Sequence, residues 1–196
     1  MPNYRRAYVP GGTFFFTVRT ASHGRWLTET SALAALRESI RQTRLLSPFK
    51  TDAIVILPDH IHAIWTLPNG DSDFSSRWRS IKYATTRQLS CLGGHGESTA
   101  FKSRPRRTER GFWQRRFWEH CIRDEDDLNA HLDYIHYNPV KHRVARCPHA
   151  WPWSSFHSYV RRGVLPYEWG CQCLEDAVPP SVPVLPGNAG EDDRVL

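Results

Sequence analysis

The chain has 196 residues, with 26 Lys and Arg against 20 Asp and Glu and a formal net charge of +6 at pH 7. This length allows one domain with its own hydrophobic core, and no apolar run is long enough to span a bilayer. The first residues lack the apolar segment of a secretory signal and the five cysteines include no CxxC pair, so we expect a cytoplasmic protein without structural disulfides.

Patterns in the first half of the chain predict three strands and two helices. Runs of β-branched and aromatic residues bounded by glycine or proline are typical of strands. Apolar residues at helical spacing after capping-type residues favour helices. In chain order, we expect a strand at 13–20, a helix at 28–46, strands at 51–57 and 60–67, and a helix at 73–92.

The second half adds a basic loop, a strand and a helix. We expect the loop at 93–111, the strand at 113–122 and the helix from its cap at Asp124 to about Tyr137. The helix should end there because Asn138 precedes a proline and is steered out of the helical region. If the 73–92 helix is set aside, the order approximates an α+β, ferredoxin-like β-α-β-β-α-β fold, with an antiparallel sheet and helices on one face. The closing strand is not identified by the sequence.

Positive charge is concentrated between Phe74 and Arg123. This stretch holds twelve Lys and Arg residues against three Glu, a net charge of +9, and aromatic residues lie between them. Lys and Arg neutralise phosphates, and exposed aromatic faces can stack on unpaired bases. Most of the aromatics are expected in the core, and some of the charges could be a solvated rim. The imbalance nevertheless favours a polyanion as partner.

The residues from Pro166 onward have a different composition. Acidic residues are frequent there and Arg194 is the only Lys or Arg, while prolines and glycines are also frequent. This predicts a flexible tail at 166–196 behind a domain at 1–165. The tail could be a solvated C-terminus. Alternatively, its acidic residues could mimic a polyanion and fold back over a groove formed by the basic stretch. Its Cys171-Gln-Cys173 could form half of a metal site, but we interpret the cysteines as scattered reduced thiols.

His60 and His62 stand two residues apart on the third predicted strand. Their side chains therefore project to the same face, while Ile61 points to the other. Imidazole nitrogens are good ligands of divalent metals. Most pairs with this spacing are surface or core histidines, so the pair alone is a weak indication of a metal site.

Tyr134 and Asn138 are four residues apart, which places them on one helical face. The amide oxygen of Asn138 suits Mg²⁺ or Mn²⁺, which predicts a metal site formed with His60 and His62. A metal that polarises a phosphate would compensate for the phenol's intrinsic pKa of about 10. A phosphotyrosine link retains the bond energy for rejoining a strand. Tyr137 could take the role of Tyr134.

Four blocks of sequence resemble the tyrosine transposases associated with repetitive extragenic palindromes (REP), which are single-copy relatives of insertion-sequence transposases. The blocks are Leu57-Pro-Asp-His-Ile-His62, Gly111-Phe-Trp-Gln-Arg-Arg-Phe-Trp118, Tyr134-Ile-His-Tyr-Asn-Pro-Val-Lys-His142 and Trp151-Pro-Trp-Ser-Ser-Phe156. They follow the family's order, and the resemblance covers roughly residues 1–165. The resemblance implies that His60 and His62 are the metal pair, Tyr134 the nucleophile and Asn138 the third ligand. Asp59, where many relatives carry Asn, is interpreted as a turn residue.

The resemblance also implies a substrate. Members of the family are metal-dependent endonucleases and strand transferases that act on single-stranded DNA folded into an imperfect hairpin, and they recognise a short guide sequence 5′ to its stem. Arg5 and Arg6 are similar in position to residues that contact the guide. Candidates for contacts with the hairpin backbone are Arg104, Arg106, Arg107, Arg115 and Arg116. Such a protein would be associated with the nucleoid, as a monomer or a homodimer.

We therefore expect a transposase-like nuclease that cleaves palindromic DNA hairpins through a covalent 5′-phosphotyrosine intermediate with Mg²⁺ or Mn²⁺. Two alternatives stay open. One is a regulatory hairpin-binding protein with little chemistry. The other is a nuclease like the relaxases and replication initiators, which use the same motif on different DNA.

Overall fold

The computed structural model describes residues 8–91 and 111–172 of the chain. Contacts divide the chain into two compact units, one made of residues 1–52 and 56–121 and the other of residues 53–55 and 122–196. Each unit has its own internal packing and is described by itself.

The first unit is built on a four-stranded sheet. Its elements are, in chain order, β1 (Thr13–Arg19), η1 (Ala21–His23), α1 (Thr30–Leu46), β2 (Lys50–Ile56), β3 (His60–Thr66), α2 (Phe74–Cys91) and β4 (Trp118–Cys121). The strand order is β2-β3-β1-β4, and β1 pairs antiparallel with both β3 and β4. This arrangement confirms the predicted ferredoxin-like α+β fold.

The assignment of elements within this fold corrects the prediction. The sequence predicts the Asp124 helix as the second helix of the β-α-β-β-α-β order, whereas α2 takes that place and β4 closes the sheet. Strand β4 is also shorter than predicted. Trp113 forms only an isolated bridge with Thr20, and the exposed Arg115 and Arg116 interrupt the strand.

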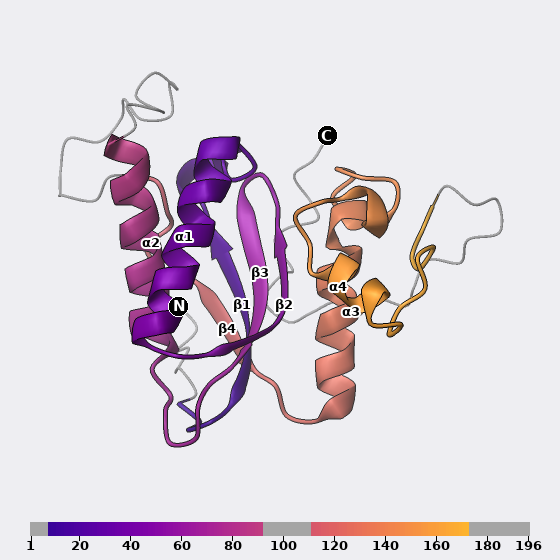
Figure 1. The fold of residues 1–196 in the computed structure, drawn as a ribbon, viewed down its shortest axis with the longest axis horizontal. Helices are drawn as coiled ribbons and strands as arrows, with labels where there is room; N and C mark the ends of the chain where they lie inside the picture. Colours follow the sequence, from indigo (N-terminus) through magenta and orange to yellow (C-terminus); the bar gives the residue numbers. More distant parts are fainter. Residues whose placement is uncertain (1–7, 92–110, 173–196) are drawn as a thin grey trace, which may run out of the picture. The chain divides into compact units, whose positions relative to one another are not determined.

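The core of this unit lies between the sheet and its two helices. Figure 1 shows α1 and α2 side by side on one face of the sheet. Side chains alternate along the strands, which directs Phe14, Phe16 and Trp65 to this face. There the Trp65 ring stacks on Trp78 of α2, with 4.2 Å between centroids. The alternation leaves the opposite face of the sheet to the intervening residues.

The second unit contains α3 (Glu125–Lys141), η3 (Pro148–Ala150) and α4 (Phe156–Arg161). Helix α3 begins as predicted after Asp124, whose carboxylate accepts a hydrogen bond from the backbone N–H of Asp127 at 2.8 Å. Such a bond satisfies one of the N–H groups that the first turn leaves without a helical partner. The middle of β2 belongs to this unit, since the backbone N–H of Ser155 donates to the carbonyl of Ile54 at 2.8 Å.

The end of α3 differs from the prediction. Asn138 and Pro139 lie inside the helix, which continues to Lys141, and both residues are buried. Pro139 lies in the last turn, where its missing N–H removes one hydrogen bond. Burial of this turn in the second unit outweighs the local preference of a residue before proline for extended backbone.

The remaining predicted elements are found within two residues of their expected ends. Of the predicted loop at 93–111, residues 93–110 lie outside the described residues. None of the described helices is apolar over a length that would cross a membrane.

Candidate active site

His60 and His62 lie next to each other on β3, and both are buried. Their rings are 4.8 Å apart between centroids. Being two residues apart on a strand, they share the sheet face opposite to α1 and α2. Two imidazole nitrogens so placed can bind one metal ion.

Each histidine is oriented by a contact of its Nδ1 atom. Nδ1 of His60 lies 2.8 Å from Oδ1 of Asp59, and Nδ1 of His62 lies 3.0 Å from Oγ1 of Thr17 on β1. Metal-binding histidines commonly donate one ring N–H to a carboxylate or another oxygen, which sets the tautomer and makes the second nitrogen the ligand. In both residues that ligand would be Nε2.

Asp59 has a role that the sequence-based interpretation as a turn residue missed. Burial alone would raise the pKa of this carboxyl, but the hydrogen bond and charge of His60 outweigh it and lower the pKa to about 2. The charged carboxylate orients the His60 ring, as carboxylates beside metal-binding histidines commonly do. The signal in the sequence was an acidic residue directly before the first histidine.

Aromatic side chains flank the histidines on this face. The ring of Phe15 stacks on His62 at a centroid distance of 5.3 Å and meets the edge of Trp118 at 5.7 Å. The sheet face thus combines two nitrogen donors with an aromatic lining. Such a lining strengthens electrostatic interactions at the histidines, because its polarity is low.

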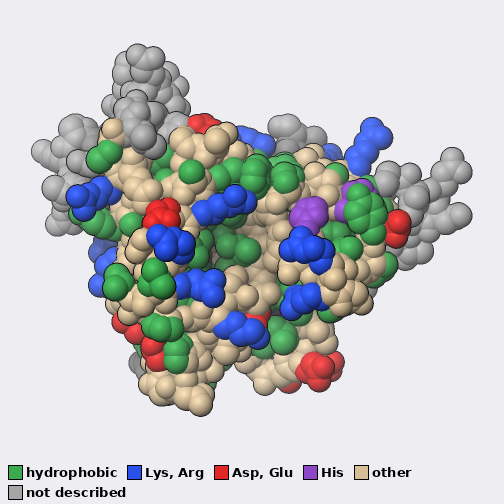
Figure 2. Space-filling view, in the orientation of Figure 1, with side chains coloured by type: hydrophobic (Ala, Val, Ile, Leu, Met, Phe, Trp, Pro, Cys, Tyr) green, Lys and Arg blue, Asp and Glu red, His purple; other side chains and the backbone are tan. Residues whose placement is uncertain are grey.

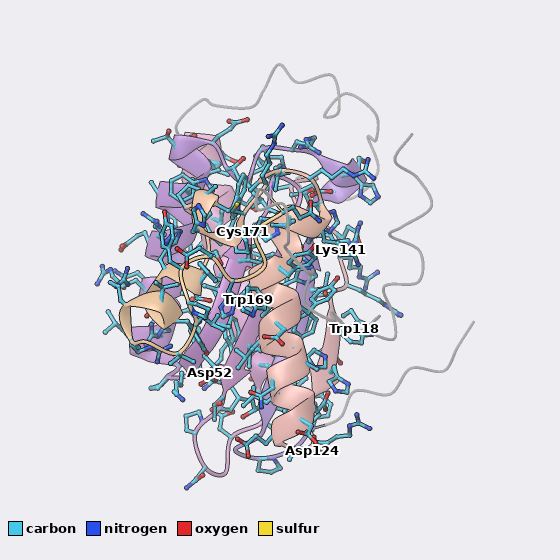
Figure 3. All side chains as sticks on the ribbon, turned by 90° about the vertical axis from the view of Figure 1, so that its right-hand side faces the viewer. Asp52, Trp118, Asp124, Lys141, Trp169 and Cys171 are labelled. Carbon is cyan, nitrogen blue, oxygen red and sulfur yellow. The ribbon has the colours of Figure 1, made fainter. Side chains whose placement is uncertain are left out.

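Helix α3 carries Tyr134 and Asn138 one turn apart on the same face, and both are buried. Figure 3 labels Asp124 at the start of this helix and Lys141 at its end. Within the part of the chain that the structure describes, neither Oδ1 nor Nδ2 of Asn138 has a hydrogen-bond partner. A buried amide in this state costs on the order of 1–3 kcal/mol, so it calls for a functional explanation.

The two tyrosines of α3 have different surroundings. Nζ of Lys141 lies 5.1 Å from the ring centroid of Tyr134, within the range of a cation–π interaction. The hydroxyl of Tyr137 instead accepts a hydrogen bond from Nε2 of Gln172 at 2.9 Å. A Cβ atom added at Gly170 would lie only 3.1 Å from the Tyr137 ring. Tyr137 is therefore fixed by packing and a hydrogen bond, whereas Tyr134 lies beside a cation.

The predicted residues fall into two pairs, each formed within its own unit. His60 and His62 belong to the first unit, and Tyr134 and Asn138 belong to the second. An active site that uses all four residues requires the two units to meet.

Two of the predicted DNA-contacting arginines are described, and both Arg115 and Arg116 are exposed. Figure 2 shows further Lys and Arg side chains spread over one face. Arg77, in contrast, is buried and forms a salt bridge with Asp71 at 2.6 Å, so it does not contribute to a basic surface. The other predicted residues lie outside the described residues; they are Arg5, Arg6, Arg104, Arg106 and Arg107.

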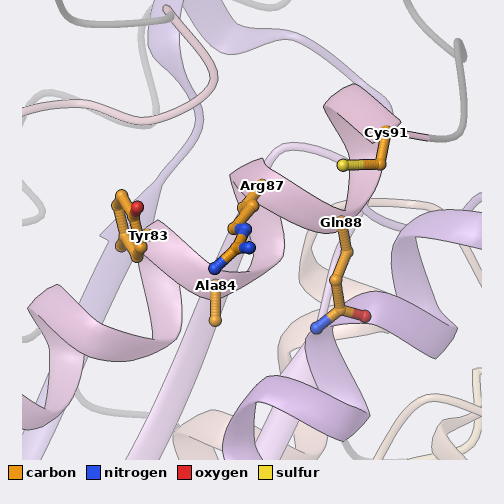
Figure 4. Close-up of a pocket in the computed structure, with 5 residues that line it drawn as sticks. All are labelled: Tyr83, Ala84, Arg87, Gln88 and Cys91. Atoms are coloured by element: carbon orange, nitrogen blue, oxygen red, sulfur yellow. The ribbon is translucent and has the colours of Figure 1, made fainter.

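A shallow depression lies on the surface of α2 (Figure 4). Its volume is about 470 Å³, and it is lined by Tyr83, Ala84, Arg87, Gln88 and Cys91. All five residues come from one helix, and none of them is a predicted ligand or nucleophile. The depression is therefore not part of the candidate active site.

Comparisons with known proteins agree with the resemblance seen in the sequence blocks. No protein-family model matches the chain. The chain is 42% identical over 169 residues to a REP-associated tyrosine transposase of Escherichia coli K12, covering 86% of this chain and 91% of that protein. It is 45% identical over 175 residues to a Haemophilus influenzae protein that bears the same name provisionally, covering 87% and 94%. A solved structure of a REP-associated tyrosine transposase bound to a REP hairpin is 39% identical, with a TM-score of 0.72 over 91% of this chain and 97% of that one.

Proposed function

Because the chain belongs to the family of REP-associated tyrosine transposases, we propose that it cleaves and rejoins one strand of hairpin-forming DNA through a covalent link to Tyr134. Membership of the family makes the chain a transposase, which is a DNA-processing enzyme.

A single-stranded DNA hairpin is the proposed substrate. The structurally similar relative holds a REP hairpin. The net charge of +9 between Phe74 and Arg123 suits a polyanion, since Lys and Arg displace the counterions of phosphates. The exposed Arg115 and Arg116 would contact the hairpin backbone, which positions DNA without reading its sequence.

A divalent metal, Mg²⁺ or Mn²⁺, fits the donor set of His60, His62 and Asn138. The Nδ1 contacts of the histidines direct Nε2 to a ligand, and the amide oxygen of Asn138 is a hard donor without another partner among the described residues. When bound, the metal would polarise the scissile phosphate and stabilise the charge that develops on it.

Tyr134 is the proposed nucleophile. Its phenol oxygen would attack the phosphorus, lose its proton and form a 5′-phosphotyrosine bond, while the bond from phosphorus to the 3′ oxygen breaks and that oxygen takes up a proton. Lys141 places a cation beside the ring of this residue. The hydrogen bond of Tyr137 to Gln172 supports a structural role for the second tyrosine.

The observation that carries the catalytic proposal is the buried amide of Asn138, one helical turn from Tyr134 and without a hydrogen-bond partner in the described residues. Most buried polar groups are hydrogen bonded, so an amide in this state supports binding of a ligand such as a metal ion.

Incubation of the full chain with Mn²⁺ and a labelled single-stranded hairpin from the repeats of its own genome tests the proposal. We expect a protein–DNA adduct that resists denaturation. Tyr134→Phe should abolish it, a loss of about 10³-fold or more, and Tyr137→Phe is the matched control that should keep it. Tight binding of palindromic strands without any adduct would leave a hairpin-binding protein instead, and an adduct lost only in Tyr137→Phe would exchange the tyrosines.

A further inference from the structure

Three potential metal ligands that the proposed reaction does not use gather in the second unit. They are Cys147, His149 and Cys171, and one ligand atom of each lies within 4.8 Å of the others. Both cysteines are buried, and His149 is half-buried. Figure 3 labels Cys171 in the segment that follows α4. We propose that these three residues form a structural zinc site.

The backbone brings the three residues together across a long stretch of chain. Cys147 and His149 stand on either side of Pro148 at η3, and Cys171 follows α4. The N–H of Gln172 donates to the carbonyl of Arg146 at 3.0 Å, which ties the two segments to each other. This backbone hydrogen bond holds the segment of Cys171 next to the segment of Cys147.

The imidazole is held in place as well. The ring of His149 stacks on Tyr167, with 4.2 Å between centroids and 19° between planes. Its Nδ1 lies 3.3 Å from Sγ of Cys171 and 3.2 Å from the carbonyl oxygen of Tyr167. Metal binding through Nδ1 would replace the contact with that carbonyl by a coordinate bond.

The donor set selects zinc among the common metals. Two thiols and one imidazole are the soft and borderline ligands that structural zinc prefers, and Mg²⁺ and Mn²⁺ prefer oxygen. Zinc–sulfur and zinc–nitrogen bonds of about 2.3 and 2.1 Å place tetrahedral ligand atoms roughly 3.5–4 Å apart. The ligand atoms of the cluster, all within 4.8 Å of one another, are close to this spacing.

The thiols are available to a metal because none of the four described cysteines forms a disulfide bond. Tetrahedral zinc takes a fourth ligand, which would be water.

The site would stabilise the part of the second unit that packs against α3. Gln172, next to Cys171, donates to the hydroxyl of Tyr137, and a Cβ atom added at Gly170 would lie only 3.1 Å from the ring of the same tyrosine. Zinc would therefore support the helix that carries Tyr134, without taking part in chemistry. This inference does not depend on the proposed cleavage reaction.

Metal analysis of the untagged full chain, purified in a thiol-free reductant, tests the site. We expect about one equivalent of zinc per chain, retained in a His60→Ala/His62→Ala variant that lacks the proposed active-site histidines. Cys147→Ser and Cys171→Ser should lose the zinc. Cys91→Ser, at an exposed cysteine of α2, is the matched control and should keep it.

Replacement of the metal by Co²⁺ identifies the ligands without any variant. The wild-type protein should show a thiolate-to-cobalt charge-transfer band in the near ultraviolet, which His60 and His62 cannot produce, and a strong chelator should lower its Tm. A folded, reduced wild-type protein without this band would overturn the proposal. So would a Cys147–Cys171 disulfide in freshly isolated protein, since it would assign the pair a redox role.

Discussion

Strand β3 and helix α3 each carry half of the candidate active site, but they hold their residues in different ways. On β3, the Nδ1 atoms of His60 and His62 contact Asp59 and Thr17, so the rings are oriented before any ligand binds. On α3, the amide of Asn138 is buried without a partner among the described residues. A histidine whose Nδ1 atom is hydrogen bonded is already oriented for binding a metal through Nε2. A buried polar group without hydrogen bonds instead lowers the stability of the folded protein. The strand is thus prepared for a metal, and the helix gains stability only when its amide is satisfied.

Loss of a metal ligand from either element should have the largest effect. His62→Ala and Asn138→Leu should each lower hairpin cleavage on the order of 10³-fold, as loss of a principal electrostatic group does. Their stabilities should move in opposite directions. His62→Ala leaves a cavity and removes the contact with Thr17, whereas Asn138→Leu removes a buried amide that makes no hydrogen bond.

Urea unfolding of the metal-free variants measures this difference. The free energy of unfolding should fall for His62→Ala and stay equal or rise for Asn138→Leu. If both variants are destabilised equally, the contrast between the strand and the helix is wrong.

Arg77 tests whether satisfied polar groups stabilise the first unit in general. Its guanidinium donates to the carboxylate of Asp71 and to the carbonyls of Ser47, Pro48 and Asp73. Arg77→Met should cost on the order of 1–3 kcal/mol, because it leaves buried carbonyl groups without their hydrogen bonds, while the half-exposed Asp71 can turn to solvent. Thermal unfolding measures this change in stability. If Arg77→Met leaves the stability unchanged, the hydrogen bonds of Arg77 position these segments without stabilising the fold.

Acid should remove part of this stabilisation. The hydrogen bond from Arg77 lowers the pKa of Asp71, so the stabilising contribution is complete above the carboxyl's ordinary pKa of about 4 and is lost as the pH falls below it. The stability difference between the wild type and Asp71→Asn should therefore shrink from pH 7 towards pH 3. A difference that is constant with pH would exclude the ion pair as its cause.

Asp59→Asn tests the orientation of His60 more gently. An amide keeps the turn but removes the charge, so Mn²⁺ should bind about 10–100-fold more weakly while the protein stays folded. Titration calorimetry of the full chain measures the affinity. An unchanged affinity for Mn²⁺ would show that Asp59 serves only as a turn residue.

Asp124→Ala should give the smallest of these effects. The Asp124 carboxylate accepts the N–H of Asp127 at the start of α3, and loss of such a cap costs about 1 kcal/mol. Asp126→Ala, at an exposed residue of the same first turn, is the control. It should lower the free energy of unfolding by only about 0.3 kcal/mol, because it removes a charge near the helix dipole but no capping hydrogen bond. Equal losses would assign the stabilisation to charge alone.

Much of the fold follows from local patterns. The aromatic and β-branched run at Thr13–Arg19 and the apolar spacing in Thr30–Leu46 predicted their elements because both signals depend on neighbours in sequence. The place of α2 in the sheet was not predicted, since strand order depends on pairings between residues far apart, such as Thr17 with His62. The end of α3 was wrong because a local rule for residues before proline met a buried helix turn.

The site was predictable to the same extent. Spacing alone places His60 and His62 on one face of a strand, and Tyr134 and Asn138 on one face of a helix. Contacts that join distant segments give no such signal. The hydrogen bond from Gln172 to Tyr137 and the approach of Cys171 to His149 emerge only in three dimensions.

Pro139 inside the last turn of α3 also has a consequence for the chemical ageing of the protein. Asparagine converts slowly to aspartate when the backbone nitrogen of the next residue attacks the side-chain amide. The nitrogen of Pro139 carries no hydrogen and cannot form the cyclic imide, so Asn138 is protected from this damage. Asn69, exposed and followed by Gly70, has no such protection. The proline that disturbs the helix thus preserves the neutral amide of the residue before it over the lifetime of the molecule.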